Sequence, residues 1–527
     1  MLSTTAAGVG AGLWLSKKDK AASGEFPVRI LGPNSTAGHR LRDGFKFPEP
    51  QQSSEVDVLI VGGGMAGLSA AWRLQKKGQN NFKIIELEDS VGGNSRSGKN
   101  EISKFPWGAH YVTLLNEEAE AARELFEDFG IITGYKDGQA LYNDYFLCQA
   151  PHEKLFIYQK WQEGVVPKIG NSTNDDNQIK AFFEFVEEMR FKKGKDARFA
   201  FSIPMAMSSS DPKFLVLDAV SMKDYMQSQG WDSAALNWYV NYCCRDDFGT
   251  PHDKTSAWAG LHYFCSRRTR ADGVDGSSVL TWPEGNGWLV DRMHERLANF
   301  IQTGSMAIRL EAKPDQVVVD TWSEAEQQVQ RWKAKSVILA IPRFVSAHLS
   351  PDLAMSQGPI VKELEYAPWM VANISLKQNP KLTSRAWDNV LFKSESLGYV
   401  DATHQSVQQQ QSSTVWTYYY PLDQKPAPEA RREALQRSPG FWKELIVSDL
   451  QSAYPEIADD ILGIDVWLWG HAMIRPKPGF MWGPAREQMQ KSQGRLHFAH
   501  SDMSGFSIFE EAHYHGVRAA DEVLKNG

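Results

Sequence analysis

The sequence predicts an α/β protein built around a parallel sheet, and three neighbouring features carry that prediction. An apolar run at Val58–Val61 leads directly into glycines at 62, 64 and 67, which have the spacing G-x-G-x-x-G. Apolar residues then recur at helical spacing from Leu68 to Leu74. A second apolar run follows at residues 82–86 and ends in an acid. A strand, a tight turn, a helix and a second strand in this order are typical of a βαβ unit.

Each glycine of this turn has a separate physical task. Gly62 lets the chain turn sharply, Gly64 lets a pyrophosphate approach the backbone, and Gly67 lets the helix pack closely on the strand. The free N–H groups at the helix start then face the anion.

Glu86 stands at the ~20-residue offset where a carboxylate accepts hydrogen bonds from an adenosine ribose, and its charge disfavours the 2′-phosphate of NADP. The alternative is an ordinary βαβ unit with a glycine turn.

Further segments extend the pattern along the chain. Gly92 and Gly93 open a second loop that can lie along a pyrophosphate, with Arg96 as a countercharge. The run Trp282–Trp288 precedes a helical pattern. The remaining predicted elements are strands at 316–319 and 334–342, a segment at 494–502 that ends in Asp502, and a C-terminal helix at 511–524.

Composition excludes several classes of function. The chain has 527 residues and a net charge of −7, so a nucleic-acid partner is not expected. One to three domains fit this length. The four cysteines are Cys148, Cys243, Cys244 and Cys265, and their spacing is typical of neither a metal site nor a disulfide framework. Buried packing is the main interpretation of the adjacent pair, and redox chemistry is the alternative.

The N-terminus resembles the hydrophobic region of a secretory signal. Residues 6–15 are apolar and rich in small residues, and small residues recur at 21–24. The run is shorter than the ~20 residues that span a bilayer. Export to the periplasm is the expectation, with the usual basic start of the signal lost to a misplaced start codon, and a disordered leader on a cytoplasmic protein is the alternative. No other segment of the sequence is predicted to cross a membrane.

In combination these motifs resemble the flavin-containing amine oxidase and phytoene desaturase superfamily. The likeness covers residues 55–112, 280–345 and 490–526. It implies FAD as the cofactor and a Rossmann-like FAD-binding domain of the three-segment GR2 type, with an inserted mixed α+β substrate domain. The implied division gives residues 1–54 to a leader and linker, residues 55–112, 280–349 and 465–527 to the FAD-binding domain, and residues 113–279 and 350–464 to the substrate domain.

The resemblance also implies which residues contact FAD. The main chain of Val317 would meet the adenine, and Asp502 would contact the ribityl–phosphate region. Ala512, at a helix start, would offer its N–H to the flavin N1/O2 edge, where a helix N-terminus stabilises the negative charge of the reduced ring. The full set of implied contacts is Gly62, Gly64, Met65, Ala66, Gly67, Glu86, Leu87, Gly93, Asn94, Arg96, Gly108, Ala109, His110, Val317, Asp502 and Ala512.

Three departures from the family pattern bear on the chemistry. No cysteine follows Cys265, so FAD is expected to be bound without a covalent link. Asn94 stands where the family's GG loop commonly continues with arginine. Asn373, in a predicted strand at 368–376, stands where amine oxidases of the family often carry a lysine that holds a water at flavin N5. An asparagine there favours a dehydrogenase, desaturase or isomerase over an oxidase that reacts with oxygen.

Candidate catalytic residues follow from the same resemblance. His110 is the first choice for a proton acceptor, because its segment is implied to run near the isoalloxazine ring. Phe509 and Trp469 are candidates for aromatic walls beside the reacting group. The acidic pair Asp246 and Asp247 is interpreted as part of a solvated loop, with reception of a cationic substrate as the alternative.

Three functions remain open on the sequence alone. The first is a FAD-dependent oxidoreductase that oxidises an amine (a polyamine, a monoamine or an amino acid) by hydride transfer to flavin N5. The second is a FAD-dependent desaturase or isomerase with an apolar substrate. The third is a flavin-bound protein without turnover. A small-molecule substrate is the expected partner and no metal is expected, whereas the oligomeric state and the electron acceptor are left undetermined.

Overall fold

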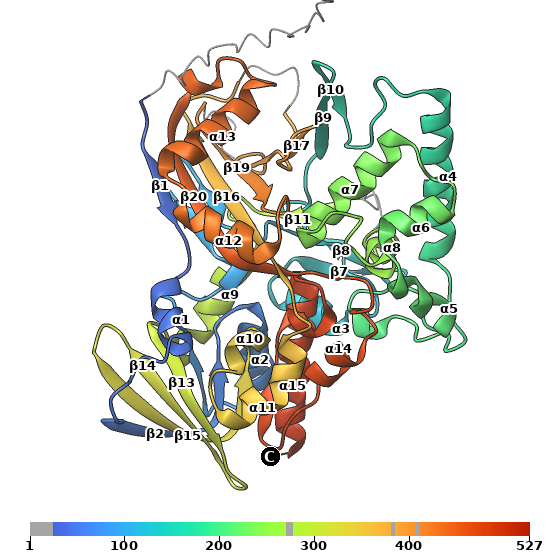
Figure 1. Ribbon diagram of the computed structural model, residues 1–527. Coiled ribbons are helices and arrows are strands. Elements are labelled where there is room, and N and C mark those ends of the chain that lie inside the picture. Colours follow the sequence, from blue (N-terminus) through green and yellow to red (C-terminus); the bar gives the residue numbers. More distant parts are fainter. Residues whose placement is uncertain (1–24, 270–277, 381–384, 407–411, 527) are drawn as a thin grey trace, which may run out of the picture.

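Two large sheets form the framework of the computed structural model, which describes residues 25–269, 278–380, 385–406 and 412–526 (Figure 1). The first sheet has the strand order β12-β3-β2-β15-β14-β13, with β21 paired beside β15. The second sheet has eight strands in the order β1-β20-β16-β19-β18-β17-β9-β10. The signal-like segments 6–15 and 21–24 lie outside the described residues.

The first sheet contains the predicted βαβ unit. β2 (Gln52–Val61) and β3 (Phe82–Ile85) are parallel, and α2 (Met65–Lys76) connects them. β15 (Gln328–Leu339) pairs parallel with the other side of β2, and β21 (Leu496–Phe498) pairs parallel with β15. The last four residues of β2 are apolar and buried, as expected for a central strand of a parallel sheet. The prediction of an α/β fold is confirmed.

An antiparallel meander extends this sheet on one side. β13 (Ser305–Ala312), β14 (Val317–Ser323) and β15 pair in turn, and they reach to the lower left of Figure 1. β12 (Ile301–Gln302) pairs with β3 at the opposite edge. The meander brings residues more than 200 positions beyond the glycine turn into the same sheet as that turn.

The C-terminal helix α15 (Phe509–Asn526) packs along α2, beneath the glycine turn. The two helices approach closely at Gly516, where an added Cβ would lie 2.3 Å from the carbonyl oxygen of Ala66. Any side chain at position 516 would clash with α2, so only glycine allows the two helices to pack this closely. The helix predicted at 511–524 is therefore present and begins two residues earlier.

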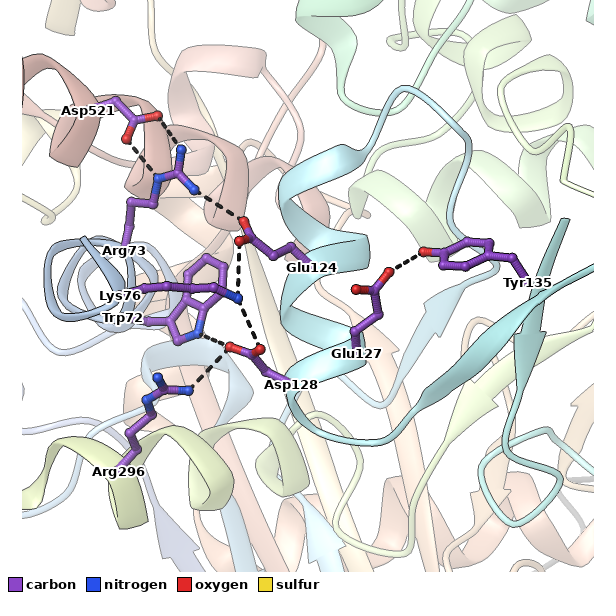
Figure 2. Close-up of polar contacts among 9 residues, drawn as sticks. All are labelled: Trp72, Arg73, Lys76, Glu124, Glu127, Asp128, Tyr135, Arg296 and Asp521. Carbon is purple, nitrogen blue, oxygen red and sulfur yellow. Dashed lines mark hydrogen bonds and ion pairs between the residues drawn. The ribbon is translucent and has the colours of Figure 1, made fainter. Parts of the chain in front are cut away.

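A network of charged side chains joins α2 to three other helices (Figure 2). Arg73 of α2 donates to Asp521 of α15 (2.7 Å) and to Glu124 of α3 (Glu120–Asp128; 3.1 Å). Asp128 of α3 accepts from Trp72 and Lys76 of α2 and from Arg296 of α9 (Gly287–Leu297). Partly exposed ion pairs of this kind contribute on the order of 0–1 kcal/mol each, so the network orients the helices more than it stabilises them.

The second sheet is centred on β16 (Tyr366–Leu376), which pairs antiparallel with β20 (Ile461–Ile474) and β19 (Thr414–Pro421). α12 (Ala427–Gln436) and α13 (Pro439–Gln451) cover one face. Met370 and Ala372 belong to the core beneath these helices. Because side chains alternate along a strand, Trp369 and Val371 face the opposite side, toward the first sheet and the helices drawn in green in Figure 1.

The other elements complete these layers. The remaining strands of the second sheet are β1 (Val28–Leu31), β9 (Glu153–Ile157), β10 (Lys160–Glu163), β17 (Asp388–Leu391) and β18 (Tyr399–Asp401). The small paired strands are β4 (Ser97–Lys99), β5 (Lys104–Pro106), β6 (Tyr111–Thr113), β7 (Ile132–Lys136), β8 (Gln139–Tyr142) and β11 (Val279–Thr281). The further helices are α1 (Ser35–Arg42), α4 (Thr173–Arg190), α5 (Pro212–Leu215), α6 (Met222–Ser228), α7 (Ala234–Phe248), α8 (Ala257–Cys265), α10 (Arg343–Ser346), α11 (Pro351–Val361) and α14 (Pro484–Met489).

Two parts of the predicted domain division need correction. Residues 28–42 are not a linker: they form β1 and α1, β1 pairs parallel with β20, and Arg29 forms an ion pair with Asp465 (2.6 Å). β20, which includes residues 465–474, belongs to the second sheet and not to the sheet of the glycine turn. Short segments such as β1 carry too little periodicity to be recognised before their distant partner strand is known. The remainder of the division stays a prediction.

Candidate active site

The glycine turn after β2 is shaped by contacts that exclude any side chain. Gly62 has φ +106°, and an added Cβ there would lie 2.4 Å from the carbonyl oxygen of Ala340. A Cβ on Gly67 would lie 1.9 Å from the carbonyl oxygen of Gly62. The first contact ties the turn to the end of β15 and the second ties it to the first turn of α2. These are the tasks that the glycine spacing predicts for the two positions.

A long cavity begins at this turn, and we call it the cofactor cavity. It runs from the ends of β2 and β3, past β13, to the start of α15. The second sheet closes it through Tyr366, His471 and Ala472. The predicted contacts that line it are Gly62, Gly64, Met65, Ala66, Glu86, Leu87, Gly93, Asn94, Ala109, Asp502 and Ala512. The structure therefore brings together residues that are up to 450 positions apart in the chain.

Glu86 lies at the end of β3, where its carboxylate holds the glycine turn. Oε2 accepts the N–H of Gly63 (2.6 Å) and Oε1 accepts the N–H of Glu88 (2.9 Å). Burial raises the pKa of Glu86. Each carboxylate oxygen has a second lone pair, so Glu86 can still accept hydrogen bonds from a ligand in the cavity.

Asp502 carries an oxygen that lacks a hydrogen-bond donor. Its Oδ2 accepts the hydroxyl of Tyr366 (2.6 Å) and the N–H of Arg343 (3.3 Å). Its Oδ1 is buried without a hydrogen bond. Nδ1 of His500 lies 3.1 Å from Oδ1 but accepts the backbone N–H of Asp502 (3.2 Å), and a ring nitrogen that accepts a hydrogen bond does not donate one. A buried acceptor without a donor is costly unless a ligand supplies the donor.

Five of the predicted contacts do not line this cavity, and two of the five, Gly108 and His110, line the neighbouring cavity described below. Gly67 lies behind the turn, where it packs against Gly62. Arg96 is not free to serve as a countercharge, because it pairs with Glu88 (3.0 Å) and Asp89 (2.8 Å). Val317 is fully buried in β14, opposite Ala312 and Ala334. The cavity wall is made instead by Ser305, Met306 and Ala307 of β13, a strand that is not among those predicted from the sequence.

A second cavity adjoins the first, and we call it the substrate cavity. Six residues line both cavities, namely Asn94, Ala109, Ala472, Ser507, Ile508 and Phe509. The face of the second sheet that points away from α12 and α13 supplies Trp369, Val371, Tyr419 and Trp469. α7, α8 and the segment after α8 supply the opposite wall. A molecule in this cavity would lie directly against whatever occupies the shared end.

His110 is one wall of the substrate cavity, with Gly108 beside it. Its ring lies 4.6 Å from the ring of Tyr419 and 5.4 Å from that of Trp387, measured between centroids. The hydroxyl of Tyr419 donates to the carbonyl of Gly108 (2.9 Å), which fixes this wall. Burial lowers the pKa of His110 to about 4, so the ring is neutral at pH 7 and is a weak base.

The other predicted catalytic residues are not equivalent in the structure. Trp469 lines the substrate cavity and donates to the carbonyl of Trp107 (2.6 Å). Phe509 lines both cavities at the start of α15. Asn373 lines neither cavity, because its amide donates to the carbonyl of Pro106 (3.0 Å) and accepts the hydroxyl of Thr417 (2.7 Å). On β16 the positions that reach the substrate cavity are Trp369 and Val371, so a catalytic role for Asn373 does not fit this geometry.

The acidic end of α7 is not a solvated loop. Arg245 pairs with Asp423 (2.5 Å) and anchors the last turn of the helix to the loop after β19. Gly249, with φ +56°, ends the helix against the ring of Trp369. Both Asp246 and Asp247 line the substrate cavity. An acidic dipeptide in sequence gives no sign of burial, so only the packing of α7 could reveal this.

The two carboxylates differ in their partners. Asp247 forms an ion pair with Arg267 (3.2 Å), whereas among the described residues no cation forms an ion pair with Asp246. Burial, together with the charge of Asp247, raises the pKa of Asp246 to about 7. The negative end of the α7 dipole disfavours both anions further. A cation in the cavity would relieve this arrangement by pairing with Asp246.

His262 of α8 also lines this cavity and escaped the sequence analysis. Its Nε2 contacts the carbonyl of Ser202 (2.9 Å), so Nε2 carries the hydrogen and Nδ1 is the acceptor. The ring is stacked between Trp258 and Phe506, with centroids 5.2 Å and 4.5 Å away. Burial lowers the pKa of His262 to about 3, so it is a neutral wall at pH 7.

Two expected absences concern the described residues only. Within the described ranges no set of His, Cys, Asp and Glu side chains is arranged to hold a metal ion. None of the helices in that part of the chain combines the length and apolar character needed to cross a membrane.

Cys243 and Cys244 are buried without a disulfide, in keeping with the packing interpretation.

Comparison with known proteins places this geometry in a family. A family model described as flavin containing amine oxidoreductase matches residues 65–524. Amine oxidase [flavin-containing] B of Sus scrofa is 25% identical over 325 residues, which cover 59% of this chain and 55% of the relative. The human enzyme of the same name gives the same identity and coverage. The match thus spans about half the length of these curated relatives.

Solved structures share the fold at low sequence identity. Wild-type putrescine oxidase bound to putrescine has a TM-score of 0.67 at 15% identity, with 90% of this chain and 100% of that chain covered. Cyclohexylamine oxidase from Brevibacterium oxydans IH-35A has a TM-score of 0.65 at 14% identity, covering 90% and 99%. A fatty acid isomerase from P. acnes has a TM-score of 0.60 at 14% identity, covering 89% and 98%. At these identities the likeness shows the fold alone.

The cofactor cavity fits the FAD of this family. A Cβ on Gly64 would project toward Gly93 at 3.9 Å, so the two glycines leave the backbone open where a pyrophosphate would lie. Asp502 offers a buried acceptor without a donor, which suits a ribityl hydroxyl. The family model covers most of the chain, from Met65 to Leu524. The chain therefore belongs to the flavin-containing amine oxidoreductase family, whose cofactor is FAD and whose members are FAD-dependent oxidoreductases.

Proposed function

We propose that this protein oxidises an amine that enters the substrate cavity as a cation. The observation that supports the proposal is Asp246, a carboxylate in an aromatic-walled cavity with no described ion-pair partner. FAD held in the cofactor cavity would supply the electron acceptor for this oxidation. Amines are also the substrates in the printed names of putrescine oxidase and cyclohexylamine oxidase, which share the fold.

The walls of the cavity suit an ammonium group in two ways. Asp246 supplies a negative charge, and Asp247 is balanced by Arg267, so the excess charge rests on Asp246. Trp369 and Tyr419 also line the cavity, and an aromatic ring attracts a cation placed over its face by about 0.5–2 kcal/mol when water is excluded. An apolar substrate would gain nothing from Asp246, and its binding would bury the charge of the Asp246 carboxylate without a partner.

The shared end of the two cavities determines where the reacting carbon would lie. Ala109, Ala472 and Ile508 line both cavities and carry small or apolar side chains, so a molecule bound there could approach the flavin. Neutral His110 borders the same region and can accept a hydrogen bond from a substrate N–H. These residues would therefore contribute to the reaction by positioning the substrate and excluding water, and none of them is a strong base.

Anaerobic reduction of the flavin-loaded protein tests the proposal. We expect the absorbance of oxidised flavin to bleach on addition of one class among polyamines, monoamines and amino acids, and readmitted air would then show whether oxygen is the acceptor. Unsaturated fatty acids serve as the matched apolar probes. The proposal is wrong if no amine bleaches a flavin that dithionite can reduce.

A further inference from the structure

The wall between the substrate cavity and the protein surface is thin at one place. A surface groove runs between α3 and α15 and is lined by, among others, Arg73, Glu118, Glu120, Glu124, Pro204, Met207, His513 and Asp521. Glu510 lines both this groove and the substrate cavity. The adjacent residues Ile203 and Pro204 divide in the same way, since Ile203 lines the cavity and Pro204 lines the groove. One layer of residues therefore separates the two spaces.

Two neighbouring acids in this wall have different surroundings. Glu511 is held on both oxygens, because Oε1 accepts the N–H of Met205 (2.6 Å) and Oε2 accepts the hydroxyl of Ser504 (2.5 Å). It lines neither space and pins the loop at 203–205 to α15. Glu510 accepts one side-chain donor, the hydroxyl of Thr113 (2.8 Å). Its remaining lone pairs can therefore serve a proton that moves along the wall.

The charges around Glu510 leave it without a fixed countercharge. Among the described residues it forms no ion pair, and its side chain is 3% exposed. The titratable groups that interact with it electrostatically are Arg267 and Asp247 across the substrate cavity, Tyr142 of β8 and Glu511 on its own helix. The groove is lined by further charged or titratable groups, namely Arg73, Glu118, Glu120, Glu124 and His513. Burial raises the pKa of Glu510, which favours proton uptake over permanent ionisation.

We propose that Glu510 carries protons between the substrate cavity and the solvent of the groove. An ammonium substrate loses one proton from its nitrogen before the adjacent C–H bond breaks, and a hydride transfer then requires no further proton. Reduction of the flavin by two electrons from a chemical reductant would instead require the uptake of one proton. In the first case the carboxylate of Glu510 accepts the proton on the cavity side and releases it to groove water, and in the second the transfer runs in reverse. Because the carboxyl group of Glu510 borders both spaces, rotation of that group is sufficient to move a proton from one space to the other.

The test begins with chemical reduction, so that it does not depend on the proposed amine chemistry. Infrared difference spectra of the holoenzyme, dithionite-reduced minus oxidised, would be compared for the wild type, Glu510→Gln and the matched variant Glu120→Gln, whose exposed carboxylate faces only the groove. In spectra taken while the flavin is being reduced, we expect a transient carboxylic-acid C=O band that shifts in D2O in the wild type and in Glu120→Gln and that is missing in Glu510→Gln. An identical band in all three proteins would overturn the proposal.

An amine that reduces the flavin supplies the second measurement. We expect Glu510→Gln to delay proton release to a pH indicator by about 10-fold relative to flavin bleaching, less than the ~100-fold typical of a group that acts directly on substrate. Glu510→Asp should restore part of the rate, and unchanged FAD content shows that the variants fold. Bleaching and proton release that stay synchronous in Glu510→Gln would contradict the proposal, whereas absence of bleaching in the wild type contradicts only the amine chemistry.

Discussion

At the scale of single residues, Asp246 is the side chain to which we attribute the binding of a cationic substrate. Asp246→Asn removes the charge and keeps the shape, so we expect KM for an amine to rise roughly 10- to 150-fold, as the loss of a charged hydrogen bond of about 1.5–3 kcal/mol requires. Asp253→Asn, at an exposed position, is the matched control and should leave KM unchanged. Steady-state kinetics at constant ionic strength measure both, and equal KM values for the two variants would contradict a role for Asp246.

The pH dependence of binding follows from the same carboxyl group. Its pKa is raised to about 7, so Asp246 is protonated below that pH and anionic above it. A cationic amine should therefore bind more weakly as the pH falls through 7, whereas the amine itself stays protonated. Titration of a non-reacting amine at several pH values would show this loss, and in Asp246→Asn the dependence near pH 7 should disappear.

At the scale of elements, the turn between β2 and α2 tolerates no side chain. Gly67→Ala would place a Cβ 1.9 Å from a backbone oxygen of Gly62, so the strand and helix must separate. Overpacking of this kind typically costs about 1–3 kcal/mol of unfolding free energy, and the displaced turn should also bind FAD less tightly. Denaturant unfolding and flavin content would measure the two effects. Gly358→Ala in α11 is the control, because nothing lies within 4 Å of its added Cβ, and it should be neutral or slightly stabilising.

At the scale of the whole molecule, the cofactor cavity joins the two sheets. β13 and the glycine turn line it from the first sheet, and Tyr366 and Ala472 line it from the second. Bound FAD should therefore stabilise both sheets together, by about 2.7 kcal/mol at a free concentration 100 times Kd. Thermal unfolding of the apoprotein at increasing FAD concentrations would show the shift, and ADP, which lacks the flavin half, should give a smaller one. A melting temperature that is independent of FAD concentration would contradict this coupling.

Local patterns were sufficient for the elements that carry their own chemistry. The glycine spacing predicts the turn, because the contacts at Gly62 and Gly67 are made by residues close in sequence or by the strand packed beside them. Glu86 follows from its offset after that turn, and the C-terminal helix follows from its periodicity. Val317 lies away from the cavity because the pairing of the meander places β13, and not β14, along the cavity wall, and this pairing cannot be read from the apolar run at 316–319 alone.

The sequence by itself determined the α/β fold, the βαβ unit and the residues that mark a FAD site, since each depends on spacing within a short stretch of chain. The tertiary structure alone decided the character of the substrate cavity. Asp246 becomes a half-buried carboxylate in the cavity wall because Arg245 and Asp423 fix the end of α7 against the second sheet. Asn373 is excluded because its amide is held by Pro106 and Thr417. Burial and partners are set by residues tens to hundreds of positions away, and no local pattern contains them.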